Sequence, residues 1–277
     1  MIFHRELIRM NPFRLMPVRV AAILIGLASV FSAHAADSAA PMSAGELASR
    51  LSALRQDGVS YVRLRMEIKG ASNETFQLQI KQRRTQNTIE VVYQVLWPKE
   101  RKGESMLLRK VGNRPASGSV FVPPNTLRKI DDLKAPLLAS DLSYEDIVDN
   151  FFGWEQQSIV GAEAVEGVSC QILESKPGKG ERSSYARVRS WIDTRRMVPL
   201  RVEKYSGSGQ VLRRIDTTRV VPDAGHHIPA NLAVRGARPG SSTELDGSRI
   251  RHDVNYTDAE FTVEGFKELA TPRGSSD

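Results

Sequence analysis

The three histidines that follow residue 35 are the first side chains to consider for metal or acid–base chemistry. His226 and His227 are adjacent, and His252 lies closer to the end of the chain. Because neighbouring residues of a strand point to opposite faces, His226 and His227 would not converge on one metal ion. The sequence also contains no H-E-x-x-H, C-x-x-C or H-x-H pattern. We therefore predict no metal site.

Motifs of nucleophilic and nucleotide chemistry are missing as well. The sequence has no G-x-S-x-G turn, no P-loop and no G-x-G-x-x-G element, the spacings that expose a nucleophilic serine or cradle phosphates. A Ser/His/Asp triad assembled from distant positions stays open, and a secreted hydrolase that uses His227 or His252 is one hypothesis. Since no motif supports that hypothesis, we expect a protein that is not an enzyme and that needs no cofactor.

The start of the chain has the pattern of an export signal. The chain has 277 residues, a formal net charge of +7 and one cysteine, Cys170. A basic stretch, an apolar run over 20–32 and the small residues Ala33-His-Ala35 are the three parts of a cleavable signal peptide, which we place at residues 1–35. Without it the net charge is +4, which does not call for a nucleic-acid partner. A single cysteine excludes an internal disulfide framework, and we expect a buried, inert thiol.

The elements that must position any site begin with a helix, predicted from Ser43 to Gly58. Ser43 and Glu46 form an S-x-x-E capping box, in which each side chain satisfies a free backbone N–H group. Three leucines at helical spacing form one apolar face: Leu47, Leu51 and Leu54.

Beyond residue 58, apolar and polar residues alternate in many short segments, which is typical of strands with one buried face. Eleven segments read as strands: 62–68, 76–80, 89–96, 105–111, 118–122, 168–175, 185–193, 199–205, 211–220, 228–235 and 249–256. The predicted fold is mainly β (α+β), an incomplete antiparallel β-barrel or strongly curved sheet of about eleven strands wrapped around a few helices. We expect one domain over 43–269, after a flexible lead over 36–42 and before a disordered tail over 270–277.

A second helix is predicted over residues 143–154, between the two groups of strands. Ser143 is its expected N-cap, and Leu142 and Ile147 are spaced as a hydrophobic staple. Glu145 and Asp146 in the first turn favour the helix dipole, and we assign them that structural role. Four residues give the helix one apolar face: Ile147, Val148, Phe151 and Phe152.

Several short segments stand out by their order along the chain. They are Trp97-Pro98, Met106–Arg109, Phe121–Pro124, Arg128–Ile130, the box Ser140-Asp-Leu-Ser-Tyr-Glu-Asp146, Trp191–Asp193 and Pro199–Glu203. Together they resemble the outer-membrane lipoprotein-sorting protein family (LolA-like), over about residues 43–260. Ala139 stands where that family usually has glycine, so a positive φ is not expected there.

The resemblance implies an incomplete barrel around helices, with a hydrophobic cavity between them. It implies a periplasmic protein of a Gram-negative envelope that binds acyl chains of lipids or lipoproteins and carries them toward the outer membrane. An inner-membrane transporter and an outer-membrane acceptor are the implied partners, and a monomer is expected. The candidate lipid-contact residues, each of which also suits a core position, are Trp97, Phe121, Leu142, Tyr144, Ile147, Phe151, Trp154 and Trp191.

Two points stay open beside the carrier hypothesis: the role of four basic residues, and an alternative function. Four basic residues, expected to be exposed, either meet anionic head groups or a partner, or belong to an ordinary solvated strand face: Arg63, Arg65, Arg128 and Lys129. The alternative to a carrier is a periplasmic lipid-sensing regulatory module, which would use the same fold to bind a membrane partner protein.

Overall fold

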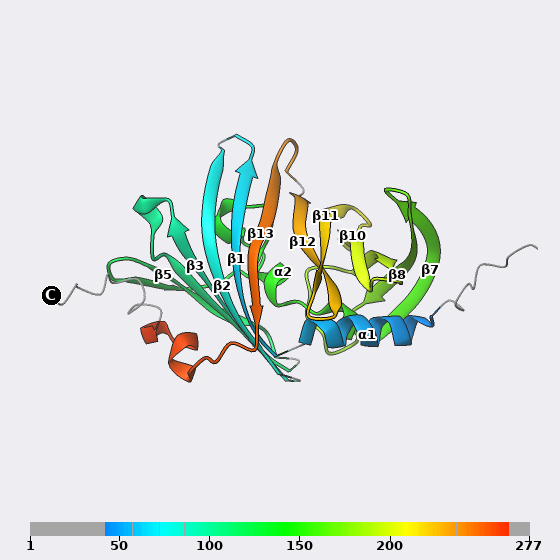
Figure 1. Ribbon diagram of the computed structural model, residues 1–277, viewed down its shortest axis with the longest axis horizontal. Helices are drawn as coiled ribbons and strands as arrows, with labels where there is room; N and C mark the ends of the chain where they lie inside the picture. The colour runs from blue at the N-terminus through cyan, green and yellow to red at the C-terminus, as the bar shows by residue number, and fades with distance from the viewer. Residues whose placement is uncertain are drawn as a thin grey trace, which may run out of the picture. The chain divides into compact units, whose positions relative to one another are not determined.

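The computed structural model describes residues 42–56, 58–71, 73–85, 87–112, 114–236 and 238–265 (Figure 1). The predicted signal peptide, nearly all of the predicted lead and the predicted tail lie outside the described residues. The helices are α1 (Ala44–Gln56) and α2 (Tyr144–Val148), with 3₁₀ turns at Lys99–Arg101, Leu137–Ala139, Phe151–Gly153 and Asp258–Phe261. The strands are β1 (Val59–Lys69), β2 (Glu74–Arg84), β3 (Thr88–Trp97), β4 (Ser105–Val111), β5 (Ser117–Val122), β6 (Thr126–Lys129), β7 (Gln156–Val165), β8 (Val168–Lys176), β9 (Arg187–Asp193), β10 (Val198–Tyr205), β11 (Val211–Asp223), β12 (His226–Gly236) and β13 (Ser242–His252).

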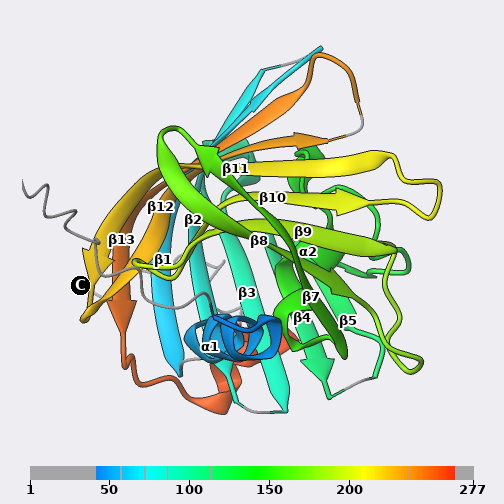
Figure 2. The same cartoon turned by 90° about the vertical axis from the view of Figure 1, so that its right-hand side faces the viewer.

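These strands form one antiparallel sheet that does not close into a barrel, which confirms the predicted fold class. The strand order is β6-β5-β4-β3-β2-β1-β13-β12-β11-β10-β9-β8-β7, so the β1–β13 pair joins two meanders. Consecutive strands β6 and β7 therefore lie at opposite edges of the sheet. The chain between them, residues 130–155, must cross from one edge to the other. This crossing segment carries α2 over one face of the curved sheet (Figure 2).

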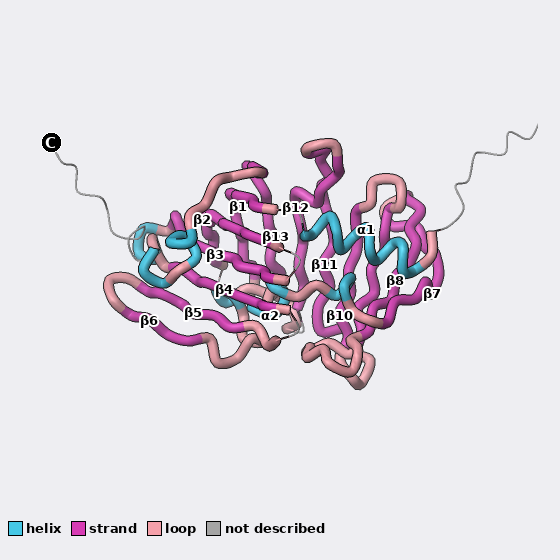
Figure 3. Tube along the Cα trace, turned by 90° about the horizontal axis from the view of Figure 1, so that it is seen from below, coloured by secondary structure: helices cyan, strands magenta, loops and turns pink. Residues whose placement is uncertain are grey.

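The inner face of the sheet, which we define as the face covered by α1 and α2, carries two clusters of apolar side chains. Along β1 and β2 the apolar residues of the core recur at every second position, as a strand with one covered face requires. The first cluster joins β1–β5 to the crossing segment: Met66, Ile68, Phe76, Leu78, Ile80, Val91, Tyr93, Val95, Met106, Leu108, Val120, Ile130, Leu137, Leu138 and Val148. The second joins α1 to the β8–β10 part of the sheet (Figure 3): Leu47, Ala48, Leu51, Phe151, Phe152, Trp154, Leu173, Tyr185, Val188, Ile192 and Val202.

The sheet has thirteen strands rather than the eleven predicted, because both edge strands lack the alternating pattern. β6 is short and exposed at every residue, and β7 is exposed along most of its length. An edge strand without a covered face needs no apolar alternation, so its sequence gives no period-two signal. The last strand was also misplaced: β13 spans Ser242–His252, not 249–256, since its first half contributes few apolar residues to the inner face.

The prediction of the first helix is confirmed, and the prediction of the second is partly wrong. The Glu46 N–H group donates to the Ser43 hydroxyl at 3.3 Å, and Ser143 and Asp146 form a complete capping box at α2. However, α2 ends at Val148, because Asp149 is extended and a separate 3₁₀ turn begins at Phe151. Val148 packs in the first cluster and Phe151 in the second, so the chain must bend between them.

Candidate functional site

The box Ser140–Asp146 lies in the crossing segment and starts from a tight turn. The Leu137 N–H group donates to the carbonyl of Leu142 at 2.8 Å, which closes that turn. Leu138 and Ala139 both have positive φ angles, 51° and 64°. The expectation that alanine would avoid this conformation at position 139 was therefore wrong. Since the left-handed region is costly for residues other than glycine, the surrounding contacts must hold this turn in place.

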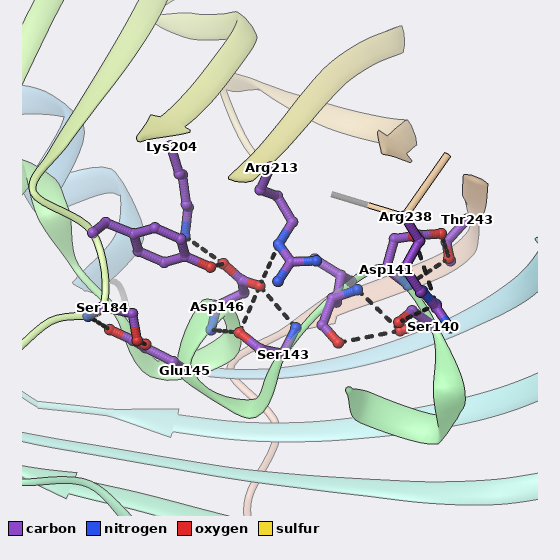
Figure 4. A network of polar contacts seen from close by, with 12 residues as sticks. Ser140, Asp141, Ser143, Glu145, Asp146, Ser184, Lys204, Arg213, Arg238 and Thr243 are labelled. Carbon is purple, nitrogen blue, oxygen red and sulfur yellow. Dashed lines mark hydrogen bonds and ion pairs between the residues drawn. The ribbon is translucent and has the colours of Figure 1, made fainter. Parts of the chain in front are cut away.

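Asp146 is the centre of a buried ionic network (Figure 4). Its carboxylate lies 2.8 Å from the Lys204 ammonium and 2.9 Å from Nε of Arg213. It also accepts hydrogen bonds from the Tyr185 hydroxyl at 2.8 Å and from the Ser143 N–H group at 2.8 Å. The side chains of Asp146 and Lys204 are only 1% and 2% exposed. The network thus fixes α2 to β10 and β11, between the two apolar clusters.

The pKa of Asp146 is lowered by this environment. Burial alone would raise the pKa of the carboxyl, but Lys204 and Arg213, together with the hydrogen bonds from Lys204 and Ser143, outweigh burial and lower it to about 2. Burial alone would lower the pKa of Lys204, but the nearby carboxylates Asp146 and Asp149 outweigh burial and keep this pKa above its ordinary value. Both groups are therefore charged at neutral pH, as a buried pair and not as acid–base catalysts.

Asp141 forms a second anchor, to β13 and the turn before it. Its carboxylate accepts hydrogen bonds from the hydroxyls of Ser241 and of Thr243, the latter at 2.9 Å, and its own N–H group donates to the Thr243 hydroxyl at 2.9 Å. Arg238 lies 3.7 Å away. Gly236 faces the same carboxylate so closely that a Cβ atom there would lie 2.8 Å from Oδ1. The side chain of Asp141 is completely buried.

The structure therefore gives the acidic residues of the box roles that sequence reasoning missed. Asp146 was assigned to the helix dipole, but its strongest partners are Lys204 and Arg213. Glu145 accepts hydrogen bonds from the Ser183 hydroxyl and the Ser184 N–H group, both at 2.8 Å. These partners lie far along the chain, and no spacing in the sequence could have identified them.

A cavity of about 630 Å³ opens beside the crossing segment, next to the β4–β5 turn, the end of β6 and the connection from β8 to β9. Its apolar wall consists of Ala116, Ile130, Leu133 and Val148. All four belong to the first apolar cluster or pack against it. The volume lies within the range of about 300–1,000 Å³ that is typical of small-ligand pockets. The cavity is thus an opening from solvent to the core of the inner face.

Five of the eight predicted lipid-contact residues lie in the crossing segment. Tyr144 and Ile147 are half-buried and pack against the first apolar cluster. Phe151 and Trp154 are buried in the second cluster. Leu142, inside the box, is buried and lines a smaller cavity of about 320 Å³. Tyr144 and Ile147 thus lie in one cluster of the inner face and Phe151 and Trp154 in the other, and none of the five residues lines the cavity of about 630 Å³.

The other three predicted residues lie elsewhere. Phe121 is buried but follows Val120 of the first cluster, so it points to the opposite face of the sheet. Trp191 precedes Ile192 of the second cluster and belongs to a third cluster on the outer face. Trp97, at the end of β3, is 45% exposed. The structure does not bring these three together with the five residues of the crossing segment.

The four basic residues considered for contact with head groups or partners lie in two different parts of the sheet. Arg63 and Arg65 alternate with core residues of β1, which places them on the outer face. Arg128 and Lys129 are exposed on the edge strand β6. Of these four, only Lys129 lines the cavity of 630 Å³.

The histidines lie at one end of the sheet, away from this cavity. All three line a pocket of about 710 Å³ with Asp223, whose carboxylate contacts Nε2 of His252. Among the described residues, no group of three or more His, Cys, Asp or Glu side chains is placed to hold a metal ion. Over the same ranges, no helix is long and apolar enough to cross a membrane.

Comparison with protein families assigns this chain to one family. A protein-family model described as "Uncharacterized protein" matches residues 89–268, more than half of the chain. No curated protein matches the sequence.

Three solved structures are similar over about four fifths of this chain and nearly all of their own. A DUF1329 family protein from Desulfovibrio piger has 24% identity and a TM-score of 0.75, with 80% of this chain and 97% of that chain covered. A putative outer membrane lipoprotein-sorting protein domain from Vibrio parahaemolyticus has 20% identity and a TM-score of 0.73, with 81% and 98% covered. A LolA superfamily protein from Nitrosomonas europaea has 18% identity and a TM-score of 0.64, with 80% and 98% covered. These likenesses confirm the LolA-like fold that the sequence resemblance implied.

Proposed function

We propose that this chain, which belongs to the family whose model matches residues 89–268, binds lipid acyl chains in the periplasm and carries them toward the outer membrane. The observation that carries the proposal is the cavity of about 630 Å³ whose apolar wall is continuous with the first apolar cluster. The names of two structural relatives, a putative lipoprotein-sorting domain and a LolA superfamily protein, support the same role. The role needs no catalytic residue.

The energetics suit a carrier. Each methylene group moved from water into an apolar site contributes about 0.8 kcal/mol. The wall residues Ile130, Leu133 and Val148 offer the first part of an apolar path. Tyr144 and Ile147 pack against the same apolar cluster and are not fully buried. We propose that the acyl chain enters here and contacts the five predicted residues of the crossing segment.

The direct test is mass spectrometry of the protein purified from its native envelope, combined with displacement of a pyrene-labelled fatty acid from the lipid-free protein. We expect a lipid or lipoprotein to co-purify with the protein, and added acyl chains to displace the pyrene-labelled fatty acid. Absence of both would refute it. If a membrane signalling protein were the main species captured, without lipid, the sensor hypothesis would replace the carrier.

A matched pair of variants locates the binding site. Leu133→Gln places an amide in the apolar wall, whereas Leu127→Gln makes the same change at a side chain that is already 45% exposed and outside the lining. We expect Leu133→Gln to weaken binding of the pyrene fatty acid roughly tenfold, since one lost apolar contact of this size is worth about 1–2 kcal/mol. Equal affinities of the two variants would show that the acyl chain binds elsewhere.

A further inference from the structure

The rim of the same cavity collects basic side chains from four separate parts of the chain. Arg114 lies in the β4–β5 turn, Lys129 ends β6, Lys134 lies in the crossing segment, and Arg182 lies between β8 and β9. All four are exposed, and none of them forms an ion pair with a described residue. Lys110 of the same lining differs, because it pairs with Glu181 at 2.9 Å.

Carboxylates also line the cavity, and several of them are already engaged. Glu181 pairs with Lys110 at 2.9 Å, and Glu145 accepts the hydrogen bonds of Ser183 and Ser184. Asp131 is exposed and has no ion pair or hydrogen bond with any residue in the described ranges. Within the described residues, the lining therefore contains both cations and a carboxylate that have no ion-pair partner.

The formal charges of the lining cancel. It contains five cations, Lys110, Arg114, Lys129, Lys134 and Arg182, and five carboxylates, Asp131, Asp132, Glu145, Asp149 and Glu181. A neutral lining creates little net attraction for an anion, yet the separated charges can each make a charge-assisted hydrogen bond at short range. The ligand that satisfies both signs carries a phosphate and an amine with no net charge.

We infer that this rim is a head-group site for a zwitterionic phospholipid of the ethanolamine class, whose phosphate meets the four basic side chains and whose ammonium meets Asp131. The inference rests on the proposed function, because the acyl chains would pass over Ile130, Leu133 and Val148 into the inner face. With such a site, the protein distinguishes lipids by their head groups and not only by their acyl chains.

The test compares three soluble short-chain lipids with identical acyl chains: a phosphatidylethanolamine, a phosphatidylglycerol and a diacylglycerol. Each one competes with the pyrene-labelled fatty acid for the full mature protein. We expect the phosphatidylethanolamine to bind roughly tenfold more tightly than the diacylglycerol, the effect of one net charge-assisted contact, and more tightly than the phosphatidylglycerol. Equal affinity for all three lipids, or preference for the phosphatidylglycerol, would overturn the inference and leave the proposed function standing. Failure of every lipid to compete would instead refute the proposed function.

Variants assign the two charges separately. Lys129→Gln combined with Lys134→Gln should lower affinity for both phosphate-bearing lipids and leave the diacylglycerol unchanged. Asp131→Asn should lower affinity for the phosphatidylethanolamine alone. Lys102→Gln is the matched control, since Lys102 is exposed and lies outside the lining. An identical lipid ranking in the control and in both rim variants would place the head group somewhere else.

Discussion

Replacing Asp146 by asparagine tests whether the buried ionic network holds the crossing segment in place. Asparagine keeps the shape of the side chain but removes the charge that faces Lys204 at 2.8 Å and Arg213 at 2.9 Å. Because the Lys204 side chain is only 2% exposed, its ammonium would stay buried beside a neutral amide. Breaking a buried pair in this way costs about 3–5 kcal/mol, so we expect a loss of that size in the free energy of unfolding at neutral pH.

The pH dependence gives an independent measure of the same interaction. The pKa of Asp146 is about 2 in the folded protein, against an ordinary value of 3.8. The ionised carboxylate therefore stabilises the fold above the ordinary pKa, and this contribution of about 2 kcal/mol is lost as the pH falls through the folded value. Asp146→Asn should lack this part of the acid destabilisation, so the difference between the two proteins should shrink below pH 4.

Urea denaturation followed by tryptophan fluorescence at several pH values measures both effects. Asp258→Asn is the control, because that carboxylate pairs with Arg83 while 93% exposed, and an exposed pair contributes at most about 1 kcal/mol. A second variant, Asp146→Asn with Lys204→Met, removes both charges and should recover part of the stability. A single Asp146→Asn variant within 1 kcal/mol of the unmodified protein, with unchanged acid sensitivity, would refute the reasoning.

Three further outcomes follow from packing and burial. Gly236→Ala should lower the melting temperature, since its Cβ atom would lie 2.8 Å from Asp141 Oδ1 and overpacking typically costs about 1–3 kcal/mol; an unchanged melting temperature would show that the turn yields freely. Phe261→Ala should cost about 3–5 kcal/mol in urea, because this ring is fully buried against the outer face under Arg83; a loss below 1 kcal/mol would contradict that packing. Cys170 is buried and its thiol pKa is raised by burial, so a thiol reagent should react with it only as the protein unfolds, and fast labelling of the native protein would show that it is accessible.

The sheet could be predicted from the sequence wherever one of its faces is covered. β1 and β2 alternate because Met66, Ile68, Phe76 and Leu78 face the first apolar cluster while the intervening residues face solvent. The edge strands β6 and β7 give no such pattern, since little covers either of their faces. Alternation reports burial rather than strand conformation, so an uncovered strand is predicted only from its neighbours.

The sequence pointed to the crossing segment but not to the residues that line the cavity. The sequence drew attention to the 140–154 region, and the structure places four of the expected apolar residues there in the clusters of the inner face. No sequence pattern indicated that Leu133 would line the cavity wall, or that Arg114 and Arg182 would lie on its rim. Those residues come from turns and connections, where no periodic pattern exists and only the folded sheet brings them together.

The most specific sequence feature, the Ser140–Asp146 box, therefore marks a position in the fold more than a point of contact with cargo. Its two buried carboxylates tie the crossing segment to β10, β11 and β13. That attachment is needed because β6 and β7 lie at opposite edges, and the segment between them would otherwise cross the inner face without strand partners. In the function that we propose, the entry of the lipid depends on residues outside the box, Ile130 and Leu133 in the wall and Lys129 on the rim. Substitutions of Asp141 and Asp146 should change stability, and substitutions in the wall and rim should change lipid binding. The opposite outcome would place the lipid at the ionic network.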